Sequence, residues 1–275
     1  MDAYMWREQD GDREVNNICS CLWKYFGMRG WLRNNYVDLS IVADNCGGQN
    51  KNRIVVRFLM WLVEMGIFPR IRLIFLVKGH TKNSCDRLFN LVKITYHHLN
   101  VYTYDMLIDT INKNEFITVH KIESSEMYDF CKWQDLFYRS PASGTFKQTH
   151  IFEISGPKHV SNSTPTLLKK WDYDGADVRT DSLLPTRRNQ KCKYLSLPER
   201  ELAISKMPDK LEVLPRPKLR DIKAVELYTK WRPILPSWAR NVTCPKPTDA
   251  VLQKVKLSRS VKIKERTQKR KLGEM

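Results

Sequence analysis

Hydrophobic positions in the first part of the chain follow helix-like and strand-like patterns in turn. Apolar residues at three- and four-residue spacing predict helices at Glu14–Phe26, Ile54–Val63 and Ser84–His97. Short apolar runs at Val37–Ala43 and Ile71–Val77 predict strands between these helices. Strands and helices that alternate at these lengths indicate an α/β sheet with right-handed crossovers.

Five further elements are predicted around this alternation. Ala3–Trp6 is expected to form an edge strand ahead of the first helix. A helix at Tyr104–Asn112, a strand at Phe116–Lys121, a helix at Met127–Phe137 and a strand at His150–Ile154 are expected to follow. We therefore expect residues 1–156 to form one α/β core.

The sequence changes in character after residue 156. Proline becomes frequent and apolar periodicity weakens, so residues 157–250 are expected to be a loosely structured, Pro-rich appendage. Short helices are predicted within it at Pro198–Ser205 and Asp221–Trp231. Residues 251–275 carry nine Lys and Arg against two acids, which predicts a disordered basic tail with some helical content.

Charge indicates the class of partner. The 275 residues include 47 Lys and Arg against 30 Asp and Glu, a formal net charge of +17. This excess favours a polyanionic partner, with DNA as the first choice. Seven scattered cysteines without a C-x-x-C pair are typical of reduced thiols, and no signal peptide or membrane span is predicted. We expect a nuclear protein, with the cytoplasm as second choice; the sequence does not indicate an oligomeric state.

Candidate chemistry lies where the Val37–Ala43 strand ends. Asp44 follows this strand directly and opens the Gly-rich stretch D-N-C-G-G-Q-N-K-N. A buried strand that ends on a carboxylate before such a turn is how an α/β sheet presents an acid to a crevice. The structural alternative is that Asp44 and Asn45 form an Asx turn, while Gly47 and Gly48 supply positive φ. This stretch alone does not decide between the two.

A second acid, Asp86, is predicted in the first turn of the helix that follows the next strand. If the two strands are parallel neighbours, Asp44 and Asp86 open onto the same edge of the sheet. Two carboxylates there suit a hard divalent cation such as Mg²⁺ or Mn²⁺, and paired cations of this kind cleave phosphodiesters. His80 would orient water or a phosphate oxygen. Nucleic-acid contacts are expected from Lys51, Lys82, Arg87, Lys269, Arg270 and Lys271.

Each of these candidates has a structural alternative. Asp86 on its own is better explained as a complement to the helix dipole, or as a surface partner of Arg87 or Lys82. His80 on its own is better explained as a turn residue, and the basic tail is equally well a solvated run of charge. Core or half-buried packing is expected for Phe58, Trp61 and Phe89, and docking onto the core for Trp171, Trp231 and Trp238, in preference to stacking on bases.

The order of elements and acids resembles the second half of the ribonuclease H-like fold of DDE transposases and integrases. Three segments resemble more closely an uncharacterised transposon-derived domain common in oomycete and invertebrate repeat elements. They are Tyr4–Trp6 with Glu14–Leu22, the D-N-C-G-G-Q-N-K-N string at Asp44–Asn52, and Gly79–Thr81 with Cys85–Phe89. The string is long and specific, and the resemblance covers about residues 3–155.

The resemblance implies a ribonuclease H-like sheet flanked by helices, with Asp44 as the second catalytic acid and Asp86 as a candidate for the third. In that fold the first aspartate lies on the first of three antiparallel strands, and this chain opens at the third. Asp2, Asp10 and Asp12 lie in the wrong place to replace it. We therefore expect an N-terminally truncated copy of a mobile-element transposase or nuclease, inactive as it stands, whose ancestral reaction on DNA needed Mg²⁺ or Mn²⁺.

The alternative function is non-catalytic binding of nucleic acid by the inherited fold and the basic tail. The net charge favours both functions equally. An unrelated α/β hydrolase or nucleotide-binding enzyme is disfavoured, because the sequence contains no G-x-S-x-G, G-x-x-x-x-G-K-[ST] or G-x-G-x-x-G string.

Overall fold

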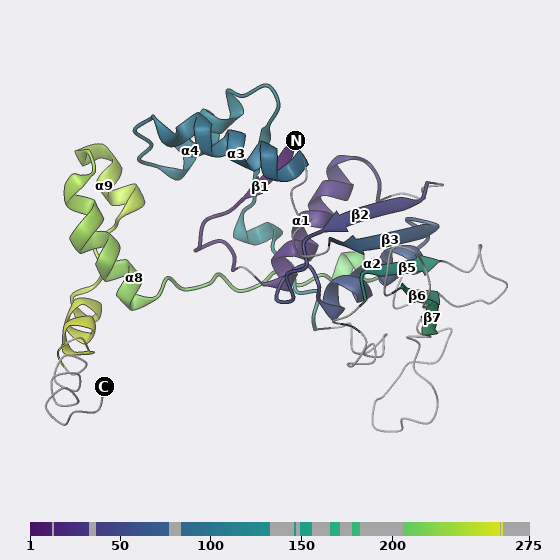
Figure 1. Cartoon of the computed structure of the whole chain (residues 1–275). Helices are drawn as coiled ribbons and strands as arrows, with labels where there is room; N and C mark the ends of the chain where they lie inside the picture. The colour runs from purple at the N-terminus through teal and green to yellow at the C-terminus, as the bar shows by residue number, and fades with distance from the viewer. Residues whose placement is uncertain are drawn as a thin grey trace, which may run out of the picture. The chain divides into compact units, whose positions relative to one another are not determined.

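The computed structural model describes residues 1–12, 14–32, 37–76, 84–132, 146, 149–155, 166–170, 178–181, 206–258 and 260. The chain divides into two compact units, and each is built from separate stretches of sequence (Figure 1). One contains Met1–Gln9, Cys85–Lys121 and Pro217–Met275, and the other contains Asp10–Ser84 and Ile122–Arg216. Neither unit ends at residue 156, where the sequence pattern predicts the end of the core.

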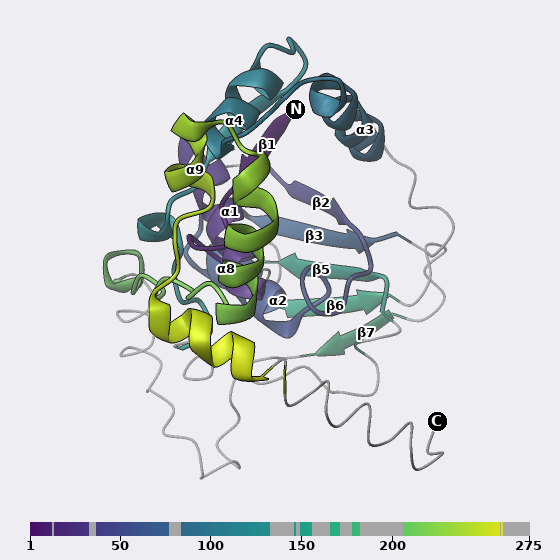
Figure 2. The same ribbon diagram turned by 90° about the vertical axis from the view of Figure 1, so that its left-hand side faces the viewer.

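The second unit is built on a mixed five-stranded sheet in the order β2-β3-β5-β6-β7 (Figure 2). Its strands are β2 (Leu39–Ala43), β3 (Arg70–Phe75), β5 (Ile151–Ser155), β6 (Thr166–Lys170) and β7 (Val178–Asp181). β2 and β3 are parallel, which confirms the predicted β-α-β crossover, whereas the other neighbours are antiparallel. The fold is mixed α/β, as predicted, but β6 and β7 lie within the expected appendage.

Helix α2 (Arg53–Glu64) connects β2 to β3 and is the centre of the core. It begins where the side chain of Asn52 accepts a hydrogen bond from the backbone N–H of Ile54, at 2.9 Å. The chain turns back directly after it at Gly66, whose φ is +71°. Every residue from Val55 to Val63 is buried, because the sheet covers one side of this helix and α1 another.

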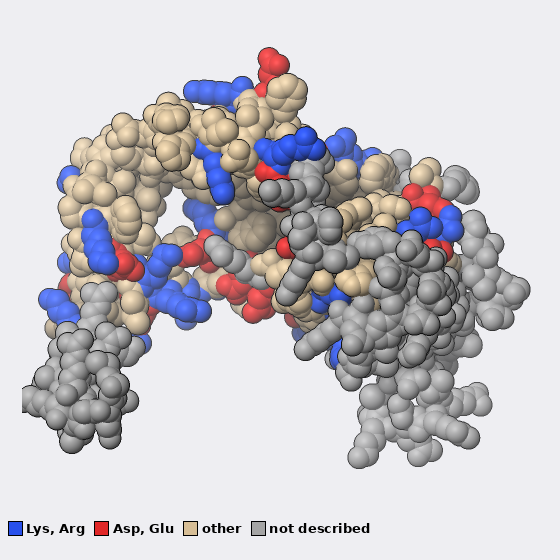
Figure 3. Space-filling model, viewed as in Figure 1, with Lys and Arg blue, Asp and Glu red and all other residues tan. Residues whose placement is uncertain are grey.

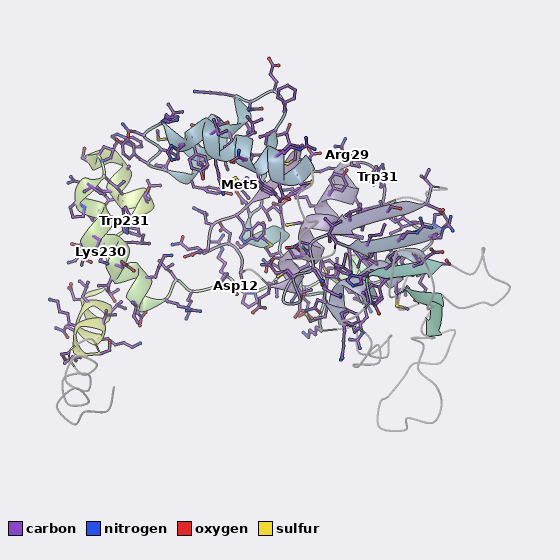
Figure 4. The ribbon with its side chains drawn as sticks, viewed as in Figure 1. Met5, Asp12, Arg29, Trp31, Lys230 and Trp231 are labelled. Carbon is purple, nitrogen blue, oxygen red and sulfur yellow. The ribbon has the colours of Figure 1, made fainter. Side chains whose placement is uncertain are left out.

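Helix α1 (Val15–Met28) packs on α2 mainly through aromatic side chains. The rings of Trp23 and Trp61 lie 5.2 Å apart between centroids, and Phe58 and Trp61 are fully buried, as predicted. Beyond the C-terminal end of α1, the ring of Trp31 meets Tyr25 edge-on at 5.6 Å. Figure 4 shows Trp31 beside Arg29 at this end of the helix.

The predicted helix at Met127–Phe137 is wrong over its described part, residues 127–132. A 3₁₀ turn, η1 (Ser124–Glu126), is followed by extended chain whose N–H groups bond to side chains of α1. Asn16 Oδ1 accepts from the N–H of Phe130 and Ser20 Oγ accepts from the N–H of Tyr128, both at 2.9 Å. The other edge of this segment bonds to residues 212–214. Side chains of α1 and the backbone of residues 212–214 thus satisfy backbone groups of residues 127–130. These tertiary hydrogen bonds outweigh the local helical pattern, and the segment is extended.

The first unit contains a parallel pair of strands, β1 (Asp2–Met5) and β4 (Thr118–Lys121). It also contains α3 (Ser84–His97) and α4 (Tyr104–Asn112), and the sequence predicts all four elements. The side chain of Thr103 caps α4 by accepting from the N–H of Met106 at 3.2 Å. Their core is formed by Ile108, Ile111, Ile117 and Val119. Core or half-buried packing is expected for Phe89; the residue is 56% exposed on α3, which excludes the core position.

We call residues 217–258 of this unit the C-terminal helices. They comprise α8 (Asp221–Glu226), the π-helical turn η4 (Leu227–Trp231), the 3₁₀ turn η5 (Arg232–Ile234), α9 (Ser237–Thr243) and a helix at residues 249–258. A further 3₁₀ turn, η3 (Pro208–Lys210), belongs to the second unit. The predicted helix at Asp221–Trp231 is confirmed, and the one at 198–205 lies outside the described residues. No helix in the described part of the chain is long and apolar enough to cross a bilayer.

We predict that Asn16→Ala destabilises the protein by about 1–3 kcal/mol, because it leaves the buried N–H of Phe130 without its acceptor. Urea unfolding followed by circular dichroism measures this change. Ser40→Ala, on the exposed face of β2, is the control and should change the free energy of unfolding by less than about 0.5 kcal/mol. Equal stability of the two variants would show that Asn16 does not hold the segment in place.

Candidate functional site

The candidate site lies where the parallel strands β2 and β3 end. Asp44 is the first residue after β2 and is exposed, as the sequence predicts. The pairing of the two strands continues to this edge, since Ala43 O accepts a hydrogen bond from Leu76 N at 3.1 Å. Asp44 is therefore held at the carboxyl edge of a parallel pair, the position at which α/β proteins commonly place ligand-binding groups.

The strand-end loop, Asp44–Asn52, closes on itself. Cys46 O accepts hydrogen bonds from the backbone N–H of Gln49 at 3.3 Å and of Lys51 at 2.9 Å. The side-chain amide of Asn50 donates to Asp44 Oδ1, which ties the end of the loop to its start. Among the described residues no donor reaches Asp44 Oδ2, so one carboxylate oxygen is positioned and the other is open.

The two glycines of this loop do not have the role that the structural alternative gives them. Neither Gly47 nor Gly48 has a positive φ, so this part of the structural alternative is wrong. A Cβ added at either position would meet nothing within 4 Å. The hydrogen bond to Asp44 comes from a side chain rather than from a backbone N–H, so no Asx turn forms at Asp44. The fold of the loop therefore does not require glycine at these two positions.

Lys51 is buried rather than directed at solvent. Its side chain is 6% exposed, and Nζ lies 5.3 Å from the centroid of the Phe75 ring at the end of β3. Burial lowers the pKa of Lys51 because the charged ammonium loses water. Contact between Lys51 and a nucleic-acid backbone stays a prediction, which requires the side chain to leave this position.

The remaining predicted site residues are not assembled with Asp44 within one unit. Asp86 and Arg87 are exposed in the first turn of α3, in the first unit, whereas Asp44 belongs to the second. A cation shared by the two acids stays a prediction. The other predicted residues lie outside the described ranges: His80, Lys82, Lys269, Arg270 and Lys271.

A divalent cation would find few ligands among the described residues. Across the described ranges no group of three or more His, Cys, Asp or Glu side chains that could hold a metal ion is found. At the strand-end loop they supply a single carboxylate, Asp44, one oxygen of which already accepts a hydrogen bond. Because Mg²⁺ is commonly bound through one or two carboxylates together with water and substrate phosphates, a cation at Asp44 stays a prediction.

Two thiols in the N-terminal half of α1 are poor nucleophiles. Burial raises the pKa of Cys21 to about 12 and that of Cys19 well above its ordinary value. Because the thiolate is the reactive form of cysteine, both side chains are inert packing groups.

Sequence reasoning missed a chain of charges across the sheet. Arg70 on β3 bonds to Asp38 through Nε at 2.8 Å and reaches Glu153 of β5, which Arg72 also contacts at 3.2 Å. The hydrogen bond to Asp38 raises the pKa of Arg70 further. Alternation of Arg and apolar residues along β3 was the available signal. Asp38 directly precedes β2. These charged side chains therefore link β2, β3 and β5 at the N-terminal end of β2, the end opposite Asp44.

A protein-family model matches residues 1–174, which is more than half of the chain. The chain belongs to the DUF7869 family, described as a domain of unknown function. The DUF7869 match spans β1 to β6 and does not reach the C-terminal helices. No curated protein and no solved structure matches the chain. Membership in DUF7869 therefore defines the family and leaves its activity open.

We predict that Gly47→Ala and Gly48→Ala leave stability unchanged or raise it by about 0.4–1 kcal/mol, because alanine restricts the unfolded chain and fits the folded loop. Gly66→Ala is the matched control. It should destabilise by roughly 1 kcal/mol, since φ there is +71°. Chemical denaturation measures all three, and a loss of stability at position 47 or 48 would contradict the observed loop.

We predict that Lys51→Met makes stability less dependent on pH. The lowered pKa means that the unfolded chain binds more protons than the folded one between the folded pKa and the ordinary lysine value. The contribution of Lys51 to the free energy of unfolding therefore rises with pH through that alkaline window. The variant should gain stability relative to the wild type at neutral pH, and this gain should shrink as pH rises. A gain that does not vary with pH, measured by urea unfolding across the window, would count against the prediction.

Proposed function

We propose that this chain is a nuclease- or transposase-type domain that acts on DNA, with Asp44 as its strand-end acid. The observation that carries the proposal is the position of Asp44, exposed at the carboxyl edge of the parallel strands β2 and β3. A reacting phosphodiester needs charged groups fixed in place before it arrives. The bond from Asn50 and the capped start of α2 support such a fixed position.

The finer fold assignment belongs to the same proposal. A β2-α2-β3 crossover with an acid directly after its first strand is compatible with the second half of a ribonuclease H-like sheet. The D-N-C-G-G-Q-N-K-N string, whose resemblance to transposon-derived domains motivates the assignment, forms the strand-end loop itself. A domain with this role is proposed to work on DNA in the nucleus.

Chemistry at this site would need more than Asp44. Bound Mg²⁺ or Mn²⁺ would supply a polarised phosphate and an activated water. The chain's own contribution would be the open Oδ2 of Asp44, with Asp86 as the proposed second carboxylate. That the chain is inactive as it stands remains a prediction, and the assay below tests it.

The second candidate function is DNA binding without cleavage. The net charge of +17 favours it, because Lys and Arg that neutralise phosphates release counterions and so drive binding. It does not require Asp44. The two candidates therefore differ in what a change at this one carboxylate does.

We predict that Asp44→Asn abolishes any Mg²⁺- or Mn²⁺-dependent cleavage or joining of DNA by the full chain and leaves DNA binding in place. Asp38→Asn is the matched control, because Asp38 flanks the other end of β2 and bonds to an exposed arginine of the sheet. A supercoiled plasmid with each metal tests cleavage, and fluorescence anisotropy over a salt series tests binding.

Three results separate the candidates. Cleavage that is lost in Asp44→Asn and kept in Asp38→Asn supports the nuclease proposal. Cleavage unaffected by either change refutes the role of Asp44. No cleavage by the wild type, together with salt-sensitive binding that both variants retain, supports the binding function and the expected inactivity.

A further inference from the structure

The C-terminal helices carry an excess of basic side chains. Residues 217–258 contain nine Lys and Arg and three acids, and each acid is in an ion pair with a lysine. The pairs are Lys254 with Asp221 at 2.7 Å, Lys230 with Glu226 at 2.8 Å, and Lys246 with Asp249 at 3.3 Å. These acids therefore balance only three of the nine cations.

Three of the remaining basic side chains have no such partner. Lys218, Arg220 and Lys256 are exposed and form no ion pair among the described residues. On the face drawn in Figure 3, blue Lys and Arg side chains project from these helices into solvent. The surface therefore keeps a net positive charge after its internal pairs are formed, which suits a polyanion.

Large apolar side chains are exposed on the same helices. Trp231 is 53% exposed and Trp238 is 59% exposed, so the expectation that both dock onto the core is wrong; Trp171 lies outside the described residues. Figure 4 shows Trp231 next to Lys230 on η4. Trp238 meets Tyr102 only edge-on, with ring centroids 6.1 Å apart, so much of its indole remains open.

Internal hydrogen bonds hold these helices in shape. Arg232 donates to the backbone carbonyls of Arg240 and Cys244 at 2.9 and 2.8 Å, and Arg240 donates to Leu235 O at 2.9 Å. α8 continues into η4, which contacts η5, and η5 in turn contacts α9 (Figures 1 and 2). The two guanidinium groups are therefore structural, while Trp231 and Trp238 are displayed on a fixed frame.

We propose that the C-terminal helices bind single-stranded nucleic acid, with Trp231 and Trp238 stacking on bases and Lys218, Arg220 and Lys256 contacting phosphates. Exposed indoles together with cations outside ion pairs are the combination that single-strand binding uses, because unstacked bases offer π-faces and the backbone offers charge. The proposal deepens the proposed function, on which it rests for the class of partner. It assigns binding to a region outside the DUF7869 match.

The test is the affinity of the full chain for a fluorescein-labelled oligothymidine, measured by fluorescence anisotropy. Trp231→Ala and Trp238→Ala should each weaken binding by about tenfold or more. Phe116→Ala is the matched control, since Phe116 is 68% exposed in the same unit and lies outside these helices. Trp231→Phe and Trp238→Phe retain an aromatic face and should retain most of the affinity, which separates stacking from a general loss of folding.

Phosphate contacts are tested by salt dependence. Lys218→Ala and Lys256→Ala should each lower the slope of log affinity against log salt by about 0.7, the value for one phosphate contact on a single strand. An unchanged slope in both variants overturns the assignment of these two cations.

Other results would overturn the proposal. Stacking by Trp231 and Trp238 would be excluded if Trp231→Ala and Trp238→Ala both kept the wild-type affinity for oligothymidine. It would also be excluded if Phe116→Ala lost as much affinity as they do. A wild-type dimer that becomes monomeric in the tryptophan variants would assign the surface to self-association. The oligothymidine assay and the plasmid assay can fail separately. Loss of oligothymidine binding in the tryptophan variants supports this surface even if the plasmid assay shows no cleavage. Cleavage by a wild-type chain that binds no oligothymidine refutes this surface and leaves the proposed role of Asp44 standing.

Discussion

The burial of α2 on all sides is the constraint on which the second unit depends. Residues Val55 to Val63 are all buried, so this stretch of the helix has no exposed face to tolerate a shift or a rotation. Its start is fixed by the Asn52 cap and its end by the turn at Gly66. Because α2 joins β2 to β3, its position sets the parallel pairing of these strands. The strand-end loop, and with it Asp44, is held between one fixed strand and one fixed helix.

A second constraint comes from the polar face of α1. Asn16 and Ser20 are buried, and they accept hydrogen bonds from an extended segment rather than from water. A buried N–H without an acceptor is costly, so the two side chains select the extended form of residues 127–131 over a helix. The fully buried ring of Phe130, 5.0 Å from Phe58, then joins this segment to the core around α2.

The sequence predicts those features that depend on neighbouring residues. Apolar spacing places β2, α2 and β3 correctly, and the abrupt end of β2 exposes Asp44 at its carboxyl edge. Features that depend on distant stretches are not predicted: local pattern does not reveal which strand pairs with β1, and the burial of Lys51 depends on where Phe75 of β3 lies. The separation of Asp44 and Asp86 into two units likewise depends on how distant stretches of chain assemble. Predicting that each acid follows a strand is therefore not the same as predicting that they meet.

Features that folding does not need are the best guide to function in this chain. Gly47 and Gly48 adopt backbone angles open to any residue, with empty space where a side chain would lie. Trp231 and Trp238 expose large apolar surfaces that burial would stabilise. Stability alone would favour alanine at the first pair and polar residues at the second. The strand-end loop and the C-terminal helices are thus two places where the sequence departs from what its own fold requires. The proposed chemistry on DNA at the first and the proposed stacking on bases at the second would each give a reason for the departure.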